Sequence, residues 1–238
     1  MTRRRWIADE VSGNQAALTG DHADHLKRVL RARVGQQFDI ATGAVVRRGR
    51  IVTIQEGRVE FELGEEVPAV TVPNVTLLLA IFKFDRMEWA IEKSTELGVS
   101  RIVPVIARRT EAHLASAAVK RAERWHRIAM QAAEQSRRSA PPEIAAPIKL
   151  QDVVSQTASA LRIVLAESEQ QTLLRDVLAA HSGAEINLAI GPEGGWTEGE
   201  LQLFQKYGWA TASLGPTILR AETAAIAATA ITVAERGA

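Results

Sequence analysis

The sequence contains no cysteine, which excludes disulfide bonds and thiolate metal sites and favours a reducing compartment. It also has no stretch close to the ~18 uncharged apolar residues that a membrane span requires. The basic start, MTRRRWIADEV, is not followed by an apolar run and is therefore not typical of a secretory signal. We expect a cytoplasmic protein.

Histidines are few and scattered, and only His22 and His25 stand at a ligand-like spacing. Because no further ligands lie near them in the sequence, we expect no metal site. Hydrophobic residues make up 46% and charged residues 24% of the chain, which is typical of a soluble globular protein and argues against disorder.

Positive charge is concentrated in two stretches, from His25 to Arg50 and from Arg101 to Leu150, although the formal net charge is only +1. Two basic regions suit an anionic partner bound by particular faces of the protein. Charge alone favours equally a set of solvated surface arginines.

The first 72 residues have the pattern of a small β-barrel with one helix. FDIATG, RRGRIVTIQEG and RVEFELGEEV show the alternation or β-branched residues typical of strands, and glycines separate them. The spacing of apolar residues from Leu26 to Val34 predicts a helix that begins at Asp21 or His22 and ends at Gly35.

Pro68 and Pro73 bracket a predicted linker, after which strands alternate with helices. VTLLLAIFKF, RIVPVIA, RIVLAES and INLAIGPEGG are predicted strands, the first with the continuous apolar run of a buried parallel strand. An amphipathic helix is expected with Asp85 as N-cap and Gly98 as C-cap, and a long helix over residues 115–139. This alternation predicts an α/β domain around a parallel sheet.

A glycine-rich loop, GPEGGWTEGE, follows the strand INLAI. Thr197 and Glu200 form a capping-box pattern for the next helix. The glycine spacing does not fit a dinucleotide fingerprint, and no lysine follows as in a phosphate loop. Glu193 would repel a phosphate but suits a cationic or hydroxyl-bearing ligand such as S-adenosylmethionine. A tight structural turn remains an equal alternative at this point.

The tail ATASLGPTILRAETAAIAATAITVAE contains a turn at Leu214, Gly215 and Pro216, followed by a helix rich in small residues. Small side chains suit a close helix–helix contact, which we expect between subunits. Arg220 and Glu222 stand at the start of this nearly uncharged helix, where they are either caps or part of a polar site.

These motifs together resemble one family. IGPEGGWTEGE and LGPTILRAETAA, with HLKRVLR, IEKSTELGV and AMQAAEQSRRSAPPEI in the same order, are similar to the ribosomal RNA small subunit methyltransferase E family, which methylates N3 of a uridine in bacterial 16S rRNA. The resemblance spans nearly the whole chain.

The resemblance implies an architecture: a PUA-like, RNA-binding β-barrel over residues 1–72 and a SPOUT-type α/β domain over residues 73–238 with a C-terminal trefoil knot. It also implies a homodimer through the knotted domain and S-adenosylmethionine as the cofactor. The implied cofactor residues lie in three loops: Leu165, Ala166, Ile190, Gly191, Glu193, Gly194, Gly195, Leu214, Gly215, Ile218, Leu219, Arg220 and Thr223.

Methylation of uridine N3 requires the loss of the N3 proton, and the negative charge spreads to O2 and O4. A base or a stabilising cation helps this step. We predict that Arg220 stabilises the uridine anion or grips a phosphate, and that Glu222 or Glu193 acts as the base or orients the substrates. Arg220→Ala is expected to abolish methyl transfer and to keep the cofactor affinity.

The RNA partner is expected to be 16S rRNA in the assembled small subunit, with the target base unpaired or flipped out. Candidate RNA contacts are the basic residues of the two positive stretches: Lys27, Arg28, Arg31, Arg47, Arg48, Arg50, Arg137 and Arg138. A SPOUT methyltransferase for another RNA position and a non-enzymatic RNA-binding protein are the alternatives.

Overall fold

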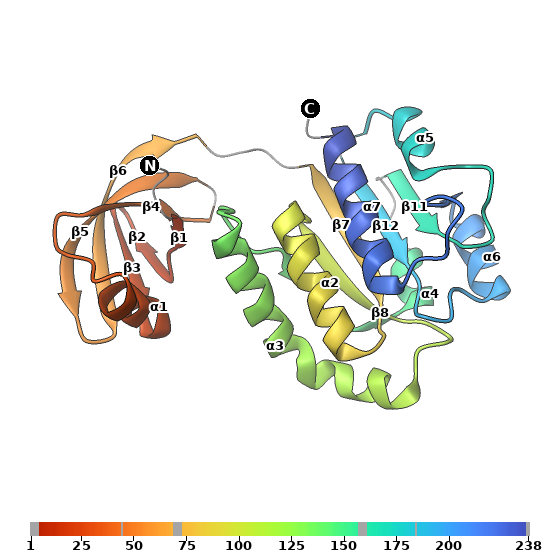
Figure 1. Ribbon diagram of the computed structural model, residues 1–238, viewed down its shortest axis with the longest axis horizontal. Coiled ribbons are helices and arrows are strands. Elements are labelled where there is room, and N and C mark those ends of the chain that lie inside the picture. Colours follow the sequence, from red (N-terminus) through yellow and green to blue (C-terminus); the bar gives the residue numbers. More distant parts are fainter. Residues whose placement is uncertain (1–4, 44, 69–72, 157–160, 184, 237–238) are drawn as a thin grey trace. The chain divides into compact units, whose positions relative to one another are not determined.

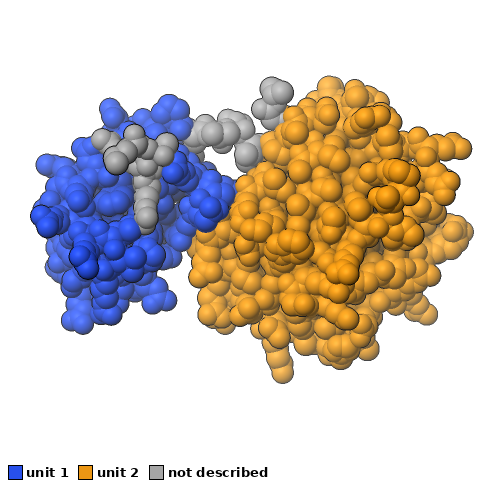
Figure 2. Space-filling model, viewed as in Figure 1, with its two compact units in different colours: residues 1–70, 133–141 blue, residues 71–132, 142–238 orange. Residues whose placement is uncertain are grey.

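The computed structural model describes residues 5–43, 45–68, 73–156, 161–183 and 185–236 (Figure 1). Within these ranges the chain forms two compact units, coloured separately in Figure 2. The first contains residues 1–70 and 133–141, and the second contains residues 71–132 and 142–238. The predicted linker falls largely on residues 69–72, which lie outside the described residues.

The first unit is built on a six-stranded sheet with the order β1-β4-β5-β6-β3-β2. The β1–β4 pair is parallel and the other pairs are antiparallel. Its strands are β1 (Arg5–Ile7), β2 (Glu10–Ser12), β3 (Gln15–Thr19), β4 (Gln37–Ala41), β5 (Val46–Gln55) and β6 (Arg58–Val67). The predicted strands FDIATG, RRGRIVTIQEG and RVEFELGEEV are confirmed as β4, β5 and β6. A buried hydrophobic cluster of this unit contains Trp6, Leu18, Leu26 and Phe61.

The predicted helix from Asp21 to Gly35 is wrong in its length. It consists of α1 (Gly20–Asp24) and a π-helical turn η1 (His25–Val29). Arg31 then takes a left-handed conformation with φ 51°, and the Ala32 amide donates to the Leu26 carbonyl at 3.1 Å. This closure ends the helix before Val34, so Val34 is 62% exposed instead of buried.

The second unit is built on a parallel sheet with the order β10-β8-β7-β12-β11-β13, and β9 also pairs with β8. Its strands are β7 (Asn74–Ala80), β8 (Arg101–Ile106), β9 (Glu143–Ile144), β10 (Ile148–Lys149), β11 (Leu161–Leu165), β12 (Glu185–Ile190) and β13 (Ala210–Ala212). The predicted α/β class is therefore confirmed. The continuous apolar run of β7 is explained by its central place, because helices cover both faces there.

Helices cover both faces of this sheet, as Figure 1 shows. One buried cluster joins the sheet to four helices: α2 (Phe84–Leu97), α3 (Ala112–Gln135), α5 (Leu174–Ala179) and α7 (Ala221–Arg236). The other joins the opposite face to α4 (Leu150–Val154) and α6 (Glu198–Lys206). Within the described ranges, we find no helix that combines the length and the apolar character needed to cross a bilayer.

One local prediction on the helices needs correction. Lys83, and not Asp85, is the N-cap of α2, and no side chain caps that end. Gly98 is confirmed as its C-cap, in the left-handed conformation with φ 109°. Part of the small-residue face of α7 lies inside its own unit, where Ala225 and Ala228 are buried and α7 packs against α2. Small side chains let these two helices approach closely, and the expected contact between subunits stays a prediction.

Candidate functional site

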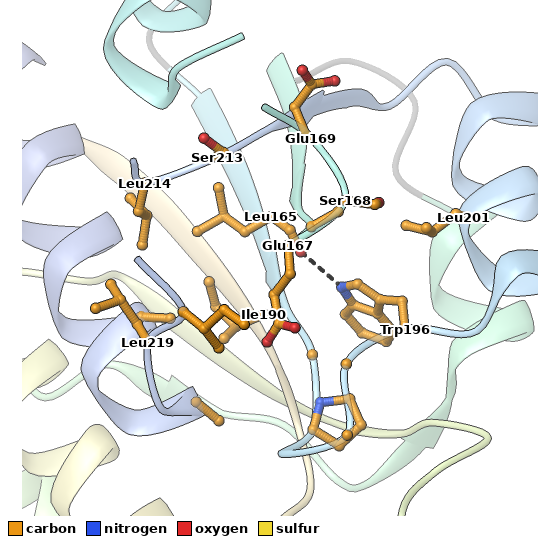
Figure 3. Close-up of a pocket in the computed structure, with 18 of the residues that line it drawn as sticks. Leu165, Glu167, Ser168, Glu169, Ile190, Trp196, Leu201, Ser213, Leu214 and Leu219 are labelled. Carbon is orange, nitrogen blue, oxygen red and sulfur yellow. Dashed lines mark hydrogen bonds between the residues drawn. The ribbon is translucent and has the colours of Figure 1, made fainter. Parts of the chain in front are cut away.

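A cavity of about 780 Å³ opens at the carboxyl ends of three neighbouring strands, β11, β12 and β13. This edge is where parallel α/β sheets bind ligands. The loops that follow the three strands, residues 166–173, 191–197 and 213–220, supply most of its wall. In Figure 3, the apolar side chains of Leu165, Ile190, Leu214 and Leu219 gather around one part of the cavity, and Trp196 lies opposite Leu214 and Leu219.

Trp196 connects two of the three loops. Its indole Nε1 donates to the Leu165 carbonyl at 3.1 Å, the dashed line in Figure 3. The ring is 7% exposed, and a Cβ placed on Gly191 would come within 3.3 Å of it. Glycine at position 191 therefore lets Trp196 pack against the start of the loop without displacement of the ring.

The glycine loop is also fixed from the side of β8. Glu200 accepts from the Arg108 amide at 2.7 Å, and its second oxygen accepts from the Thr197 amide and hydroxyl at 2.8 Å. The predicted capping box at Thr197 is thus confirmed. The Arg109 guanidinium donates to the Gly194 carbonyl. Gly195 takes a left-handed conformation with φ 69°. This loop is held in one shape by bonds on both sides.

The wall of the cavity is part apolar and part acidic. Glu167, Glu169, Glu193 and Glu198 line it, and Arg109 is its single basic residue among the described ones. Backbone hydrogen bonds from Thr172 and Gln171 lower the pKa of Glu169. An excess of carboxylates beside apolar side chains suits a ligand that carries positive charge and hydroxyl groups.

The structure brings most of the predicted cofactor residues together. The following line the cavity: Leu165, Ala166, Ile190, Gly191, Glu193, Gly194, Gly195, Leu214, Gly215, Ile218 and Leu219. Arg220 and Thr223 are exposed and do not line it. The third loop is linked to the first, because the Ser213 amide donates to the Thr172 carbonyl and the Leu174 amide donates to the Ser213 carbonyl, both at 2.9 Å.

Two of the three predicted catalytic residues lie on either side of an arginine that the sequence did not single out. Arg86 Nη1 is 3.6 Å from Glu193 Oε1, and Arg86 Nε is 3.8 Å from Glu222 Oε1. Glu222 is only 2% exposed, and its Oε2 has no hydrogen-bond partner among the described residues. Arg220, the third predicted residue, is exposed.

The predicted RNA-contact residues of β5 already have partners within the first unit. Arg47 donates to the Gly64 carbonyl at 2.9 Å, Arg48 pairs with Asp39, and Arg50 donates to Glu62 at 2.7 Å. RNA contact by these three arginines stays a prediction. Each arginine would have to bind RNA in addition to its present protein partner or in place of it.

The other basic candidates are in varied environments. Lys27, Arg28, Arg31 and Arg137 are exposed, and Arg28 is 3.5 Å from Asp24. Arg138 is half-buried, and this burial lowers its pKa. Of the predicted RNA-contact residues, these four exposed ones are accessible to an RNA backbone without rearrangement of the protein.

Comparison with known proteins gives the class first: the RNA methyltransferase domain model matches residues 70–233. Ribosomal RNA small subunit methyltransferase E of Rickettsia conorii is 32% identical over 95% of this chain and 93% of its own length. The crystal structure of a ribosomal RNA small subunit methyltransferase E from Neisseria gonorrhoeae bound to S-adenosyl methionine has a TM-score of 0.85, with 31% identity and 96% of each chain covered. A putative methyltransferase from Legionella pneumophila in complex with this cofactor has a TM-score of 0.84, with 28% identity and 98% of each chain covered.

The chain belongs to the ribosomal RNA small subunit methyltransferase E family. The family predicted from the sequence motifs is thereby confirmed. Sequence reasoning missed Arg86, Trp196 and Arg109. Arg86 and Trp196 lie in the motifs DRMEWAIEKSTELG and GPEGGWTEGE, but nothing local in the sequence shows which partners they meet, and Arg109 lies outside these motifs.

Proposed function

We propose that this chain methylates N3 of a uridine in 16S rRNA with S-adenosylmethionine as the methyl donor. The observation that carries the proposal is the cavity formed by three loops at the carboxyl ends of β11, β12 and β13, with its apolar walls and acidic lining. The relative from Neisseria gonorrhoeae was crystallised with this cofactor, and the Rickettsia conorii relative bears the name of a small-subunit rRNA methyltransferase.

The lining residues fit S-adenosylmethionine chemically. Leu165, Ile190, Leu214 and Leu219 offer an apolar surface for the adenine ring, and Glu167 and Glu169 offer acceptors for hydroxyl and ammonium groups. Arg109 is a counter-charge for the cofactor's carboxylate. The cofactor supplies a methyl group on a positively charged sulfur: the N3 lone pair takes the methyl carbon, the carbon–sulfur electron pair returns to sulfur, and the N3 proton leaves.

The protein also has to align the uracil base with the methyl group and to accept the proton from N3. Glu193 and Glu222 are the candidates for accepting the N3 proton, because one lines the cavity and the other has an unused acceptor oxygen. Arg220 is exposed, which supports the grip on an RNA phosphate over the stabilisation of the uridine anion.

The finer architecture follows the same proposal. A trefoil knot is supported by the path of the tail: it pairs with residues 172–174 through Ser213 and then returns as α7 to pack against α2. A homodimer through this domain is supported by Trp89, which is 49% exposed on α2. A PUA-like barrel is supported by the order of the first sheet, whose end strands β1 and β2 are separated by only Ala8 and Asp9.

We further propose that the substrate is the assembled small ribosomal subunit in the cytoplasm, contacted through the exposed basic residues of the first unit. The decisive experiment incubates the purified protein, S-adenosylmethionine and unmethylated small subunits, and then maps modified nucleotides in the 16S rRNA. A single 3-methyluridine is expected. Methylation at another atom or in another RNA, or none at all, would overturn the proposal.

A further inference from the structure

Arg86 occupies an unusual place between two carboxylates of the site. It projects from the first turn of α2 with its side chain 32% exposed, and Glu193, on one side of it, lines the cavity. The separations of 3.6 Å to Glu193 and 3.8 Å to Glu222 exceed hydrogen-bond length. Its N–H groups therefore form ion pairs without a hydrogen bond to any described residue, so they remain available to an acceptor on a ligand.

Within the described chain, Glu222 Oε2 lacks a hydrogen-bond donor, whereas Arg86 has donors without an acceptor. Glu222 is 2% exposed, yet Oε2 lacks a donor among the described residues. The first turn of α7 favours its negative charge through the helix dipole. A buried carboxylate oxygen without a donor is costly, and such unfilled positions occur where function requires them. Glu222 thus offers an acceptor beside the donors of Arg86.

We propose that Arg86 and Glu222 together recognise the Watson–Crick edge of the target uracil, which makes Arg86 a catalytic and specificity-determining residue. This inference rests on the proposed function. The uracil edge presents a carbonyl beside the N3–H group, so it needs one donor next to one acceptor, as this pair provides. Cytosine has a lone pair at N3 in place of the hydrogen, which the carboxylate would repel.

Access to this pair requires a rearrangement, because Glu222 Oε2 is buried in the structure. We expect the base to reach it after rotation of the Arg86 side chain, whose Nε lies 3.8 Å from Oε1 of the same carboxylate. The rotation breaks no hydrogen bond, because ion pairs at 3.6 Å and 3.8 Å hold the guanidinium.

The same pair serves the reaction. The proton on N3 passes to the Glu222 carboxylate, and the electron pair that it leaves on N3 forms the bond to the methyl carbon. While this happens, negative charge builds up on the neighbouring carbonyl oxygen, to which Arg86 donates. Donors aimed at a developing oxyanion contribute most of their effect in the transition state.

The test compares Arg86→Gln with Lys93→Gln, a matched loss of charge on the same helix at a surface pair with Glu92 and Glu96. Single-turnover methylation of small subunits is measured at saturating S-adenosylmethionine, and cofactor affinity by calorimetry. We expect Arg86→Gln to lose about 10²–10³-fold in rate with unchanged cofactor affinity, and Lys93→Gln to match the wild type. A wild-type rate for Arg86→Gln would overturn the inference.

The pH profile separates this role from a structural one. The charged groups paired with Arg86 in the described chain are Glu193 and Glu222. If Arg86 stabilises the uridine anion, the difference in methylation rate between the wild type and Arg86→Gln narrows as pH approaches the range where uridine loses its own N3 proton, because the anion then forms without help. A deficit that is constant with pH would show a merely structural role and overturn the inference.

Two outcomes have to be kept apart. If the wild-type protein transfers no methyl group to 16S rRNA, the proposed function fails and the inference fails with it. If Arg86→Gln loses cofactor binding, Arg86→Lys decides, because it keeps a positive charge between the two carboxylates. Lysine lacks the guanidinium fork, so we expect about a tenfold slower reaction with normal cofactor affinity. A wild-type rate for Arg86→Lys would overturn the inference alone.

Discussion

Two walls of the cavity are built in opposite ways. The glycine loop, residues 191–197, is fixed by Trp196, Arg109 and Glu200, each of which bonds to a backbone group. In residues 214–219 of the opposite wall, one hydrogen bond is present among the described residues, from the Gly215 amide to Ser213 Oγ at 3.3 Å. Ile218, in the same stretch, is 78% exposed.

This difference indicates a division of work. A wall that is already in its binding shape lowers the ordering cost of association, so the glycine loop defines where a ligand lies. A wall with few bonds belongs to the least stable part of a fold and adjusts readily. We therefore expect the 214–219 wall to close on the ligand while the glycine wall stays in place.

The largest expected effect comes from removing the indole of the fixed wall. Trp196→Ala should lower the free energy of unfolding by about 3–5 kcal/mol and also weaken S-adenosylmethionine binding, because a buried ring and the bond to Leu165 are lost. Denaturant unfolding and calorimetry measure the two effects. Trp209→Ala is the control, since Trp209 is buried in the same cluster but does not line the cavity. Equal loss of cofactor affinity in both variants would contradict the role assigned to Trp196.

A smaller effect is expected at the cap of α6. Thr197→Ala removes the hydroxyl of the capping box and should cost about 1 kcal/mol of stability. Thr217→Ala, an exposed threonine in the opposite wall, should leave the unfolding free energy unchanged. A larger loss of unfolding free energy for Thr217→Ala than for Thr197→Ala would contradict the view that the glycine loop is the more firmly bonded wall.

The third effect depends on pH and concerns the loop after β11. Glu169 accepts from the Thr172 amide at 2.9 Å and the Gln171 amide at 2.8 Å, and these bonds lower its pKa. A lowered folded-state pKa means that the stabilisation is present above the ordinary glutamate range and is lost as pH falls through the folded value. We therefore expect the Thr172 and Gln171 amides of the wild-type protein to lose protection from hydrogen exchange as pH falls into the acid range. Glu169→Gln has no carboxylate to protonate, so its two amides should show no such pH-dependent loss. Identical pH dependence in both proteins would contradict this account.

The smallest effect on stability is expected in the adjustable wall. Ile218→Ala should change the unfolding free energy by no more than about 0.5 kcal/mol, because the side chain is exposed in the free protein. Its cofactor affinity should nevertheless fall if this wall closes on the ligand. Unchanged affinity on calorimetry would show that the wall stays open.

Local patterns in the sequence predicted local structure well. The capping box at Thr197 and Glu200 spans three residues, and the left-handed Gly98 ends α2 as expected. The helix after Asp21 failed because its apolar spacing continues through Val34, whereas the left-handed Arg31 closes it earlier. Periodicity records which residues are apolar and does not reveal a backbone reversal at an arginine.

Contacts between distant loops could not be predicted from the residues themselves. The Trp196–Leu165 bond joins positions 31 apart, and the Arg109–Gly194 bond joins positions 85 apart. Arg86 meets Glu193 and Glu222 because α2 packs against α7 and lies near the glycine loop. No local spacing carries this information. The family resemblance predicted that the three loops converge, but it left the role of Arg86 unnoticed.

The position of the third loop in the chain has a consequence for synthesis. Residues 214–220 precede α7, and α7 packs on α2, an element made more than a hundred residues earlier. Since a ribosome makes the chain from its amino end, the cavity cannot be completed until residues 214–220 have been made. Parallel sheets with distant partners also fold slowly. A chain whose synthesis has not passed residue 220 therefore lacks one wall of the cavity.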